Sequence, residues 1–120
     1  MSYKVYIFKI HEFNQKNHKS KIIFEPGRSI VGNIGSLISK IIYIKENNKK
    51  DFIILDAAMN DLMRPALYGA NHKTIPVLKT NRISKKVYEF VGPICESTDK
   101  FTTLKKFQKL KEKDLIAMCD

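Results

Sequence analysis

Short apolar runs rich in isoleucine, separated by polar turns, fill the chain after Ile41 and constrain its fold most strongly. Two of them, residues 41–45 and 52–55, flank Asn47-Asn48, a dipeptide that suits a β-hairpin turn. Three further strand candidates follow along the chain: residues 75–78, 86–91 and 115–118. A chain of 120 residues, 43% of them hydrophobic, can bury one modest core. The sequence therefore predicts a globular chain that is mostly β from Ile41 onward.

The first twenty residues give a weaker pattern. Residues 3–10 are apolar but match neither the helical nor the strand period, so both structures stay open. Residues 11–21 are polar, as in a loop or a frayed helix end.

A strand, a tight turn and a helix are expected next. Residues 21–24 are a candidate buried strand, which Pro26-Gly27 would stop sharply. From Ser29 to about Lys40 apolar side chains recur at helical spacing and predict a helix. The change of pattern near Ile41 predicts a domain boundary, and the fold class is α+β, mostly β.

Composition narrows the class of protein. No apolar run reaches membrane-spanning length, and charged residues interrupt the N-terminus, so no signal peptide is expected. Cys95 and Cys119 do not have the spacing of a secreted disulfide framework, and the three histidines lack metal-ligand spacing. We expect a cytoplasmic protein with free thiols and no metal site, with Cys119 structural.

The net charge of +10 suggests a nucleic-acid partner, but its make-up argues against one. Only 3 of the 22 basic residues are arginine, and no tract alternates basic with aromatic side chains as a stacking platform would. The densest basic run, residues 105–113, contains Glu112 and is typical of a solvated face.

Glu25-Pro26-Gly27-Arg28 lies between the expected strand and helix. A glycine there allows close backbone approach, the first amides of a helix can bind an anion, and Arg28 adds a guanidinium suited to phosphate or carboxylate. A helix-start turn with an incidental ion pair explains the same residues.

Residues 56–68 place two carboxylates, an amide, an arginine and a tyrosine directly after an apolar strand. Arg64 precedes Pro65, which suits the first position of a short helical turn. Tyr68 follows four residues after Arg64, so the two side chains could bind one carboxylate. A half-buried Tyr68, a surface Arg64 or an internal Arg64–Asp61 pair would fit equally.

Cys95 and Glu96 follow a Gly-Pro break after the strand candidate that ends at Val91. A thiol can donate or take a proton near neutrality when its surroundings tune it. Cysteine is also among the residues most often simply buried.

Three segments together resemble diaminopimelate decarboxylases, the pyridoxal-phosphate enzymes of lysine synthesis. They are residues 22–33 (Ile-Ile-Phe-Glu-Pro-Gly-Arg-Ser-Ile-Val-Gly-Asn), residues 56–68 (Asp-Ala-Ala-Met-Asn-Asp-Leu-Met-Arg-Pro-Ala-Leu-Tyr) and residues 91–97 (Val-Gly-Pro-Ile-Cys-Glu-Ser). Their order and separations also match, and the resemblance covers residues 21–120.

The resemblance implies a role for each matching residue. Glu25 would face the pyridine nitrogen of the cofactor, and Pro26, Gly27 and Arg28 would line its phosphate pocket. Cys95 would supply the proton to the carbon that has lost carbon dioxide. Substrate binding would fall to four residues, with Glu96 on the distal amino group of meso-diaminopimelate: Arg28, Arg64, Tyr68 and Glu96.

The family's architecture is a β/α barrel that carries the cofactor, followed by a β-barrel or sandwich domain. Residues 1–40 then resemble the last barrel strand and helix, and residues 41–120 the β-domain, truncated at its end. In the family the enzyme is a homodimer in which Cys95 and Glu96 act in the partner's site.

The Schiff-base lysine of the family lies in the early barrel, and none of the 19 lysines here occupies its motif. The resemblance therefore implies the C-terminal portion of such an enzyme, from a truncated, split or decaying gene. It would be inactive alone and would need a companion barrel chain. A small basic nucleic-acid-binding module and a non-functional remnant are the alternatives.

Overall fold

The computed structural model describes residues 3–17 and 21–119, which form two compact units, Met1–Ile30 and Val31–Asp120. In the first unit, helix α1 (Tyr3–Lys16) decides the open question about residues 3–10 in favour of a helix. It continues through Lys16, whose Nζ pairs with Glu12 Oε1 at 2.8 Å, one turn earlier. Residues 18–20 of the expected loop lie outside the described residues.

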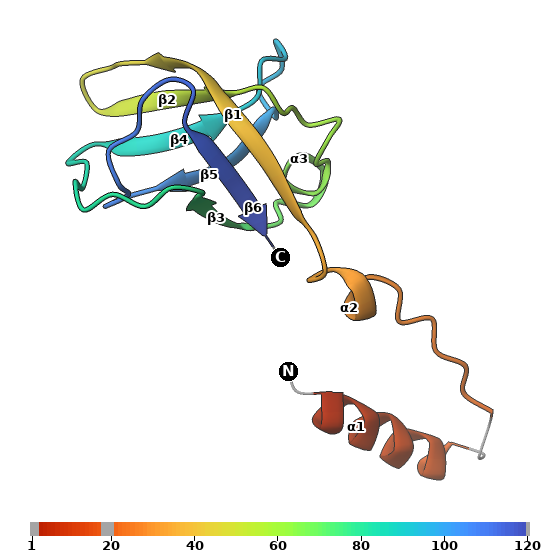
Figure 1. Cartoon of the computed structure of the whole chain (residues 1–120). Coiled ribbons are helices and arrows are strands. Elements are labelled where there is room, and N and C mark those ends of the chain that lie inside the picture. The colour runs from red at the N-terminus through yellow and green to blue at the C-terminus, as the bar shows by residue number, and fades with distance from the viewer. Residues whose placement is uncertain (1–2, 18–20, 120) are drawn as a thin grey trace. The chain divides into compact units, whose positions relative to one another are not determined.

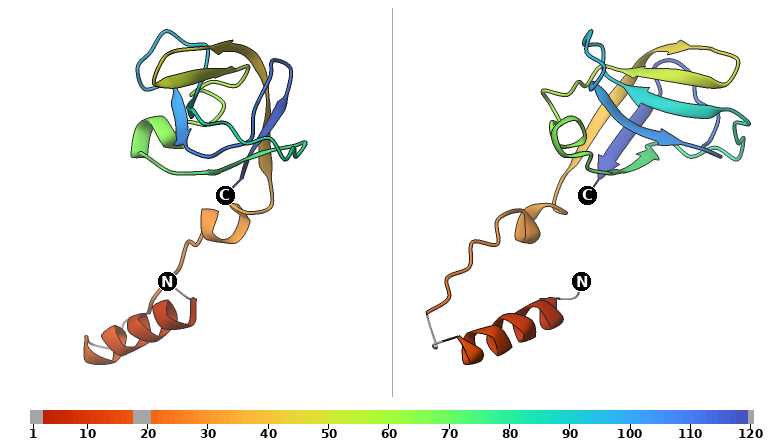
Figure 2. Two further views of the ribbon diagram at one scale, coloured as in Figure 1. Left: turned by 90° about the vertical axis from the view of Figure 1, so that its left-hand side faces the viewer. Right: turned by 180° about the vertical axis from the view of Figure 1, so that it is seen from behind.

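The second unit is a six-stranded sheet curled into a barrel-like shape, visible from three directions in Figure 1 and Figure 2. Its strand order is β3-β6-β1-β2-β4-β5, and every pairing is antiparallel except that of β2 with β4. The mostly β prediction is confirmed. The elements of this unit are β1 (Ser36–Lys45), β2 (Lys50–Leu55), α3 (Arg64–Tyr68), β3 (Lys73–Pro76), β4 (Val87–Val91), β5 (Lys100–Leu104) and β6 (Leu115–Cys119).

The core lies inside the curled sheet. Ile53 and Leu55 of β2 and Phe90 of β4 are fully buried, as strict alternation along two half-buried strands requires. Phe90 stacks edge-on against Phe107, with ring centroids 5.5 Å apart, a geometry that aromatic rings favour. The remaining core residues come from β1, β4, β5, β6 and the loops beside them: Ile41, Ala57, Tyr88, Phe101, Leu110, Ile116 and Met118.

The helix expected over residues 29–40 is wrong in extent. Helix α2 (Arg28–Val31) has only four residues, and β1 begins at Ser36. Residues 36–40 instead form a continuous ladder with β6, with Ser39 buried and Ile38 exposed, an alternation of period two. Pairing with β6 thus outweighs the helical spacing of the isoleucines, and Gly35 marks the change.

Two further element predictions need correction. The strand expected over residues 21–24 is absent, and those side chains are exposed, because a strand needs a hydrogen-bonded neighbour and the described residues provide none for this segment. Strand β5 was not anticipated, although its Phe-Thr-Thr-Leu core has the aromatic and β-branched residues that favour strands.

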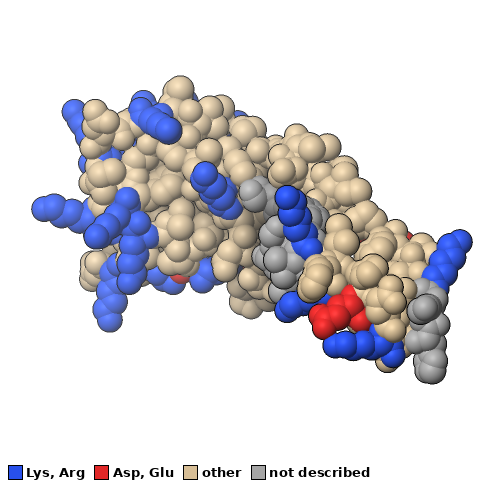
Figure 3. Space-filling model, turned by 90° about the horizontal axis from the view of Figure 1, so that it is seen from below, with Lys and Arg blue, Asp and Glu red and all other residues tan. Residues whose placement is uncertain are grey.

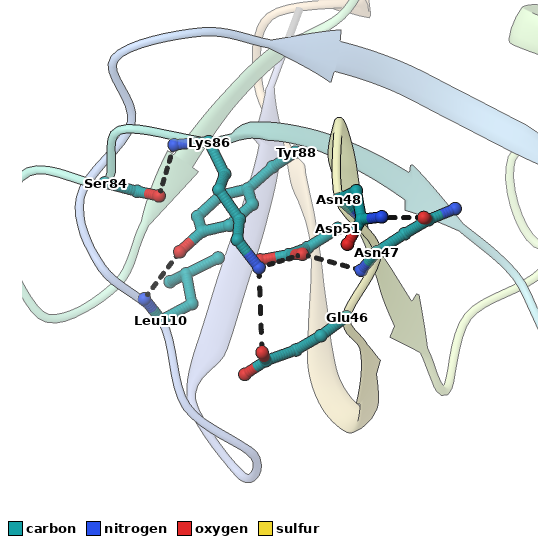
Figure 4. A network of polar contacts seen from close by, with 8 residues as sticks. All are labelled: Glu46, Asn47, Asn48, Asp51, Ser84, Lys86, Tyr88 and Leu110. Carbon is teal, nitrogen blue, oxygen red and sulfur yellow. Dashed lines mark hydrogen bonds and ion pairs between the residues drawn. The ribbon is translucent and has the colours of Figure 1, made fainter.

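The turn between β1 and β2 confirms the expected hairpin and is fixed by a buried aspartate (Figure 4). Asp51 Oδ1 accepts hydrogen bonds from the Asn47 amide at 3.1 Å and from Lys86 Nζ at 2.9 Å. Glu46 Oε2 lies 3.6 Å from the same amino group. The carboxylate raises the pKa of Lys86 through this hydrogen bond.

Basic side chains occupy part of the surface (Figure 3) and are partly paired with carboxylates. On the face drawn in Figure 3, several lysine and arginine side chains lie close together at the left of the view, and others stand apart beside broad uncharged areas. Several lysines are also paired: Glu89 binds Lys50 and, at 3.4 Å, Lys100. No helix among the described residues is long and apolar enough to cross a membrane.

Candidate active site

Residues 56–68 leave the end of β2 as an ordered loop that Asp56 anchors to β1. Asp56 Oδ1 accepts hydrogen bonds from the Ser39 hydroxyl at 2.7 Å and from the Lys40 amide at 2.8 Å. The Ser39 oxygen in turn accepts one from the Ala57 amide at 3.1 Å. The Ser39 hydrogen bond, followed by that of the Lys40 amide, lowers the pKa of Asp56. This carboxylate therefore has a structural task.

The second carboxylate of the loop is also structural. Asp61 Oδ2 accepts a hydrogen bond from the Ala58 amide at 2.8 Å, and the Asp61 amide donates to the Ala58 carbonyl at 2.9 Å. Among the described residues Asp61 forms no ion pair with Arg64, so that alternative is not realised. Much of the polarity in this segment serves to shape a turn.

Helix α3 presents the two residues expected to bind a carboxylate. The helix begins at Arg64, Pro65 lies in its first turn, and Gly69, at φ 61°, ends it in the left-handed conformation that glycine favours. The Arg64 guanidinium lies 5.3 Å from the centroid of the Tyr68 ring, within cation–π range. Tyr68 is 71% exposed, and Arg64 Nε is buried with no hydrogen-bond partner. A buried donor without a partner is costly, so Arg64 Nε lacks the hydrogen bond that burial normally requires.

The loop between β4 and β5 carries the other two residues of this unit's candidate site. Cys95 is an exposed free thiol. Glu96 is exposed, and its Oε1 accepts hydrogen bonds from the Ser97 hydroxyl at 3.0 Å and the Thr98 amide at 3.3 Å. The Ser97 hydrogen bond is the largest cause that lowers the pKa of Glu96. Glu96 is therefore an anion at neutral pH, suited to a cation.

A hollow of about 430 Å³ lies between α3 and β5. Residues from the α3 segment and from the loop that carries Cys95 and Glu96 both line it. We call it the α3–β5 hollow. It is lined by Pro65, Ala66, Gly69, Ala70, Asn71, Ser97, Thr98, Lys100, Phe101, Thr102 and Thr103. The residues just after Glu96 thus face the helix that carries Arg64 and Tyr68.

Sequence reasoning missed Asp99, the residue that joins the two segments. It is only 3% exposed, and its carboxylate accepts hydrogen bonds from the Met59 amide at 2.7 Å and the Ile94 amide at 2.9 Å. A buried carboxylate is costly unless its hydrogen bonds are satisfied. The sequence shows only that Asp99 follows a polar loop, where an aspartate often accepts hydrogen bonds from backbone amides.

Glu25, Pro26, Gly27 and Arg28 belong to the first unit, where all four are exposed. Gly27 has φ 42°, a conformation that side-chain-bearing residues rarely adopt. The amides of Ser29 and Ile30 donate to the carbonyls of Pro26 and Gly27 at 2.9 and 3.0 Å. These two amides are therefore used within the turn.

The described residues contain no group of three or more His, Cys, Asp or Glu side chains that could hold an ion. Cys119 instead accepts a hydrogen bond from the Ser36 hydroxyl at 3.2 Å, across the β1–β6 pair. His18 lies outside the described residues.

Comparison with known proteins decides the family. The model of the pyridoxal-dependent decarboxylase C-terminal sheet domain matches residues 5–120. The chain belongs to this family. A diaminopimelate decarboxylase of Bacteroides thetaiotaomicron is 52% identical over 95 residues, which cover 79% of this chain and 24% of that protein. That of Aquifex aeolicus is 45% identical over 103 residues, covering 86% and 24%.

Solved structures of decarboxylases share the fold. The diaminopimelate decarboxylase of M. jannaschii has a TM-score of 0.78 at 35% identity, over 95% of this chain and 26% of that one. The Helicobacter pylori diaminopimelate decarboxylase complexed with L-lysine has a TM-score of 0.70 at 42% identity, over 87% and 25%. This chain of the decarboxylase family thus spans about a quarter of the length of its relatives.

The residues at 25–28 fit the cofactor that the family name implies. A carboxylate suits a protonated ring nitrogen, glycine allows a phosphate to approach the backbone, and a guanidinium binds phosphate. Glu25, Gly27 and Arg28 are all exposed, so their polar groups are accessible to a bound molecule.

Proposed function

We propose that this chain supplies substrate-binding and proton-donating residues to a pyridoxal-phosphate enzyme that decarboxylates meso-diaminopimelate to L-lysine. The observation that carries the proposal is the Arg64–Tyr68 pair on α3, with its exposed phenol and a buried guanidinium nitrogen that lacks a partner. Membership of the decarboxylase family supports it. In this proposal the first unit, Met1–Ile30, belongs to the end of the cofactor-carrying barrel, and the second unit, Val31–Asp120, which contains the whole of β1, forms the β-domain.

The substrate has charges that match these side chains. Arg64 and Tyr68 bind the carboxylate that does not react, by a charge-assisted hydrogen bond and a phenol hydrogen bond. Arg28 contacts a substrate carboxylate as well, and Glu96 holds the distal ammonium group. Like any exposed glutamate, Glu96 is negative at neutral pH, so that this end of the substrate is recognised by charge.

Protonation is assigned to Cys95, whose exposed thiol can reach a bound molecule. Pyridoxal phosphate, when bound, withdraws electrons from the carbon that loses carbon dioxide. Cys95 then delivers its proton to that carbon. In this proposal it does so across a homodimer interface, as in the diaminopimelate decarboxylase family. Glu25 faces the ring nitrogen, and Pro26, Gly27 and Arg28 hold the phosphate.

The 120-residue chain alone is expected to be inactive. None of its lysines occupies the motif that binds the cofactor covalently in the family, so a companion barrel would have to supply that lysine. Mixed with pyridoxal phosphate and meso-diaminopimelate, the isolated chain should give neither the absorbance band of lysine-bound cofactor nor carbon dioxide. Release of carbon dioxide without a partner would overturn the half-site proposal.

A chimera tests the assigned roles directly. Residues 21–120 of this chain would replace the matching segment of the Aquifex aeolicus diaminopimelate decarboxylase, which is 45% identical, and carbon dioxide release would be measured. Cys95→Ser should lower kcat by about 10²–10⁴-fold, because a positioned proton donor contributes that much. Cys119→Ser is the matched control and should leave kcat unchanged.

The substrate-binding role has its own variants in the same chimera. Arg64→Gln should raise KM strongly, whereas Arg82→Gln, an exposed arginine in another loop, should not. Equal kinetics for the two arginine variants would refute the assignment of Arg64, and an active Cys95→Ser chimera would refute that of Cys95.

A further inference from the structure

Asp99 holds two segments that lie far apart in the sequence. Its Oδ1 accepts a hydrogen bond from the Met59 amide at 2.7 Å, and its Oδ2 accepts one from the Ile94 amide at 2.9 Å. Met59 precedes α3 in the loop that leads to Arg64, and Ile94 immediately precedes Cys95. One carboxylate therefore contacts the backbone of both motif-bearing segments.

The surrounding backbone is built around this carboxylate. The Gly92 amide donates to the Asp99 carbonyl at 3.0 Å, and the Asp99 amide donates to the Glu96 carbonyl at 3.0 Å. A Cβ atom on Gly92 would lie 2.2 Å from Asp99 Oδ2, far inside contact distance. Glycine at position 92 thus leaves the space that the carboxylate occupies.

The described residues place no lysine or arginine within ion-pair distance of Asp99, although it is 3% exposed. Its charge is balanced by backbone N–H groups, one per oxygen, and such hydrogen bonds to a charged acceptor are stronger than neutral ones. An asparagine could accept only one of them, because its NH₂ group would face the other N–H. The arrangement is specific for a carboxylate.

We propose that Asp99 is a positioning residue that fixes Cys95 and Glu96 relative to Arg64 and Tyr68. The inference rests on the proposed function for what those four residues do. The link itself is a property of the chain and can be measured without substrate. Asp99 touches none of the four side chains through its hydrogen bonds and acts through the Met59 and Ile94 amides.

The test uses the 120-residue chain and amide hydrogen exchange followed by NMR. Asp99→Asn keeps one of the two hydrogen bonds, so exchange should accelerate by about tenfold at whichever of the Met59 and Ile94 amides faces the new NH₂ group, the effect of losing roughly one hydrogen bond. Asp51→Asn is the matched control, since Asp51 is also buried and also accepts a backbone hydrogen bond, from Asn47. It should leave the exchange of Met59 and Ile94 unchanged.

Chemical shifts distinguish a residue that positions both segments from one that stabilises only its own loop. Asp99→Asn should shift the amide signals of α3 as well as those of residues 92–99. If the changes stay within residues 92–99, Asp99 supports only its own loop and the proposal is overturned. Equal acceleration by Asp51→Asn would also overturn it, because the effect would then be a general loss of stability.

A measurement on the unaltered chain covers the case in which Asp99→Asn does not fold. The Met59 and Ile94 amides should both be protected from exchange, and unprotected amides would overturn the proposal. None of these readouts depends on a ligand. If the chimera with Cys95→Ser or Arg64→Gln stays fully active while the exchange results hold, the proposed function fails and the Asp99 link stands.

Discussion

The two ends of the curled sheet each bury one aspartate, but they balance its charge differently. At the hairpin end, Asp51 is 6% exposed and pairs with Lys86 at 2.9 Å besides accepting the Asn47 amide. At the α3 end, Asp99 is 3% exposed and is bound by the Met59 and Ile94 amides. Among the described residues, the partners of Asp51 include a cation, whereas those of the Asp99 carboxylate are backbone amides alone.

This difference bears on which charged side chains stay available. At the hairpin end the amino group of Lys86 is paired with Asp51 and Glu46, so these three charges satisfy one another within the fold. At the α3 end backbone amides satisfy the aspartate, and neither Arg64 nor Glu96 forms an ion pair with it. When backbone amides satisfy a structural carboxylate, no charged side chain is needed to balance it, and this suits a binding site.

The largest expected effect is that of Asp99→Ala, which breaks the α3 end. Removing the carboxylate leaves two amides in a buried place without an acceptor, at a cost of about 3 kcal/mol in the free energy of unfolding. Urea denaturation followed by circular dichroism would measure it. A loss equal to that of an exposed substitution such as Arg82→Gln would contradict the structure.

A smaller loss should follow from Gly92→Ala. The added Cβ would overlap Asp99 Oδ2 at 2.2 Å, so the loop must move, at a cost of about 1–3 kcal/mol. Gly35→Ala is the control, because a Cβ there meets nothing within 4 Å. Thermal denaturation should separate the two variants by several degrees, and equal midpoints would show that the loop accommodates the methyl group freely.

At the hairpin end, Asp51→Asn should lower the pKa of Lys86 toward its ordinary value. The Asp51 hydrogen bond is the largest cause that raises the pKa of Lys86. The pair therefore stabilises the fold at neutral pH, and this stabilisation is lost as the pH rises through the raised pKa of Lys86. An NMR titration of the lysine side chains would report the change. An unchanged Lys86 pKa would place its partner elsewhere.

The smallest effect concerns Asp56, which is exposed but hydrogen-bonded to β1. Because its pKa is lowered in the folded state, its contribution is present above the ordinary pKa of about 3.9 and is lost as the pH falls through the folded value. Asp56→Asn should therefore cost about 1 kcal/mol or less at neutral pH and nothing in strong acid. Denaturation at several pH values tests this, and a cost that persists in acid would contradict it.

Residue patterns predicted the parts of this fold that depend on local sequence. The hairpin, the short helix that contains Pro65 and the strand before Gly92 could all be predicted, because turn residues and β-branched runs determine the structure of only a few neighbouring positions. The start of β1 was not, since its pairing with residues 115–119 overrode a helical spacing. Asp99 was missed because its partner Met59 is 40 residues away.

One pairing in the sheet explains why the two loops of the candidate site share an end. Strands β2 and β4 run parallel, from Lys50 beside Val87 to Ile54 beside Val91, so both strands deliver the chain to the same rim. Two strands joined by a hairpin would have released the loops at opposite rims. The cost is a long crossover, residues 56–86, whose first part carries Arg64 and Tyr68. The connection that the parallel pairing requires is thus also the segment that carries both residues of the proposed carboxylate site, and shortening it would remove the crossover and that site together.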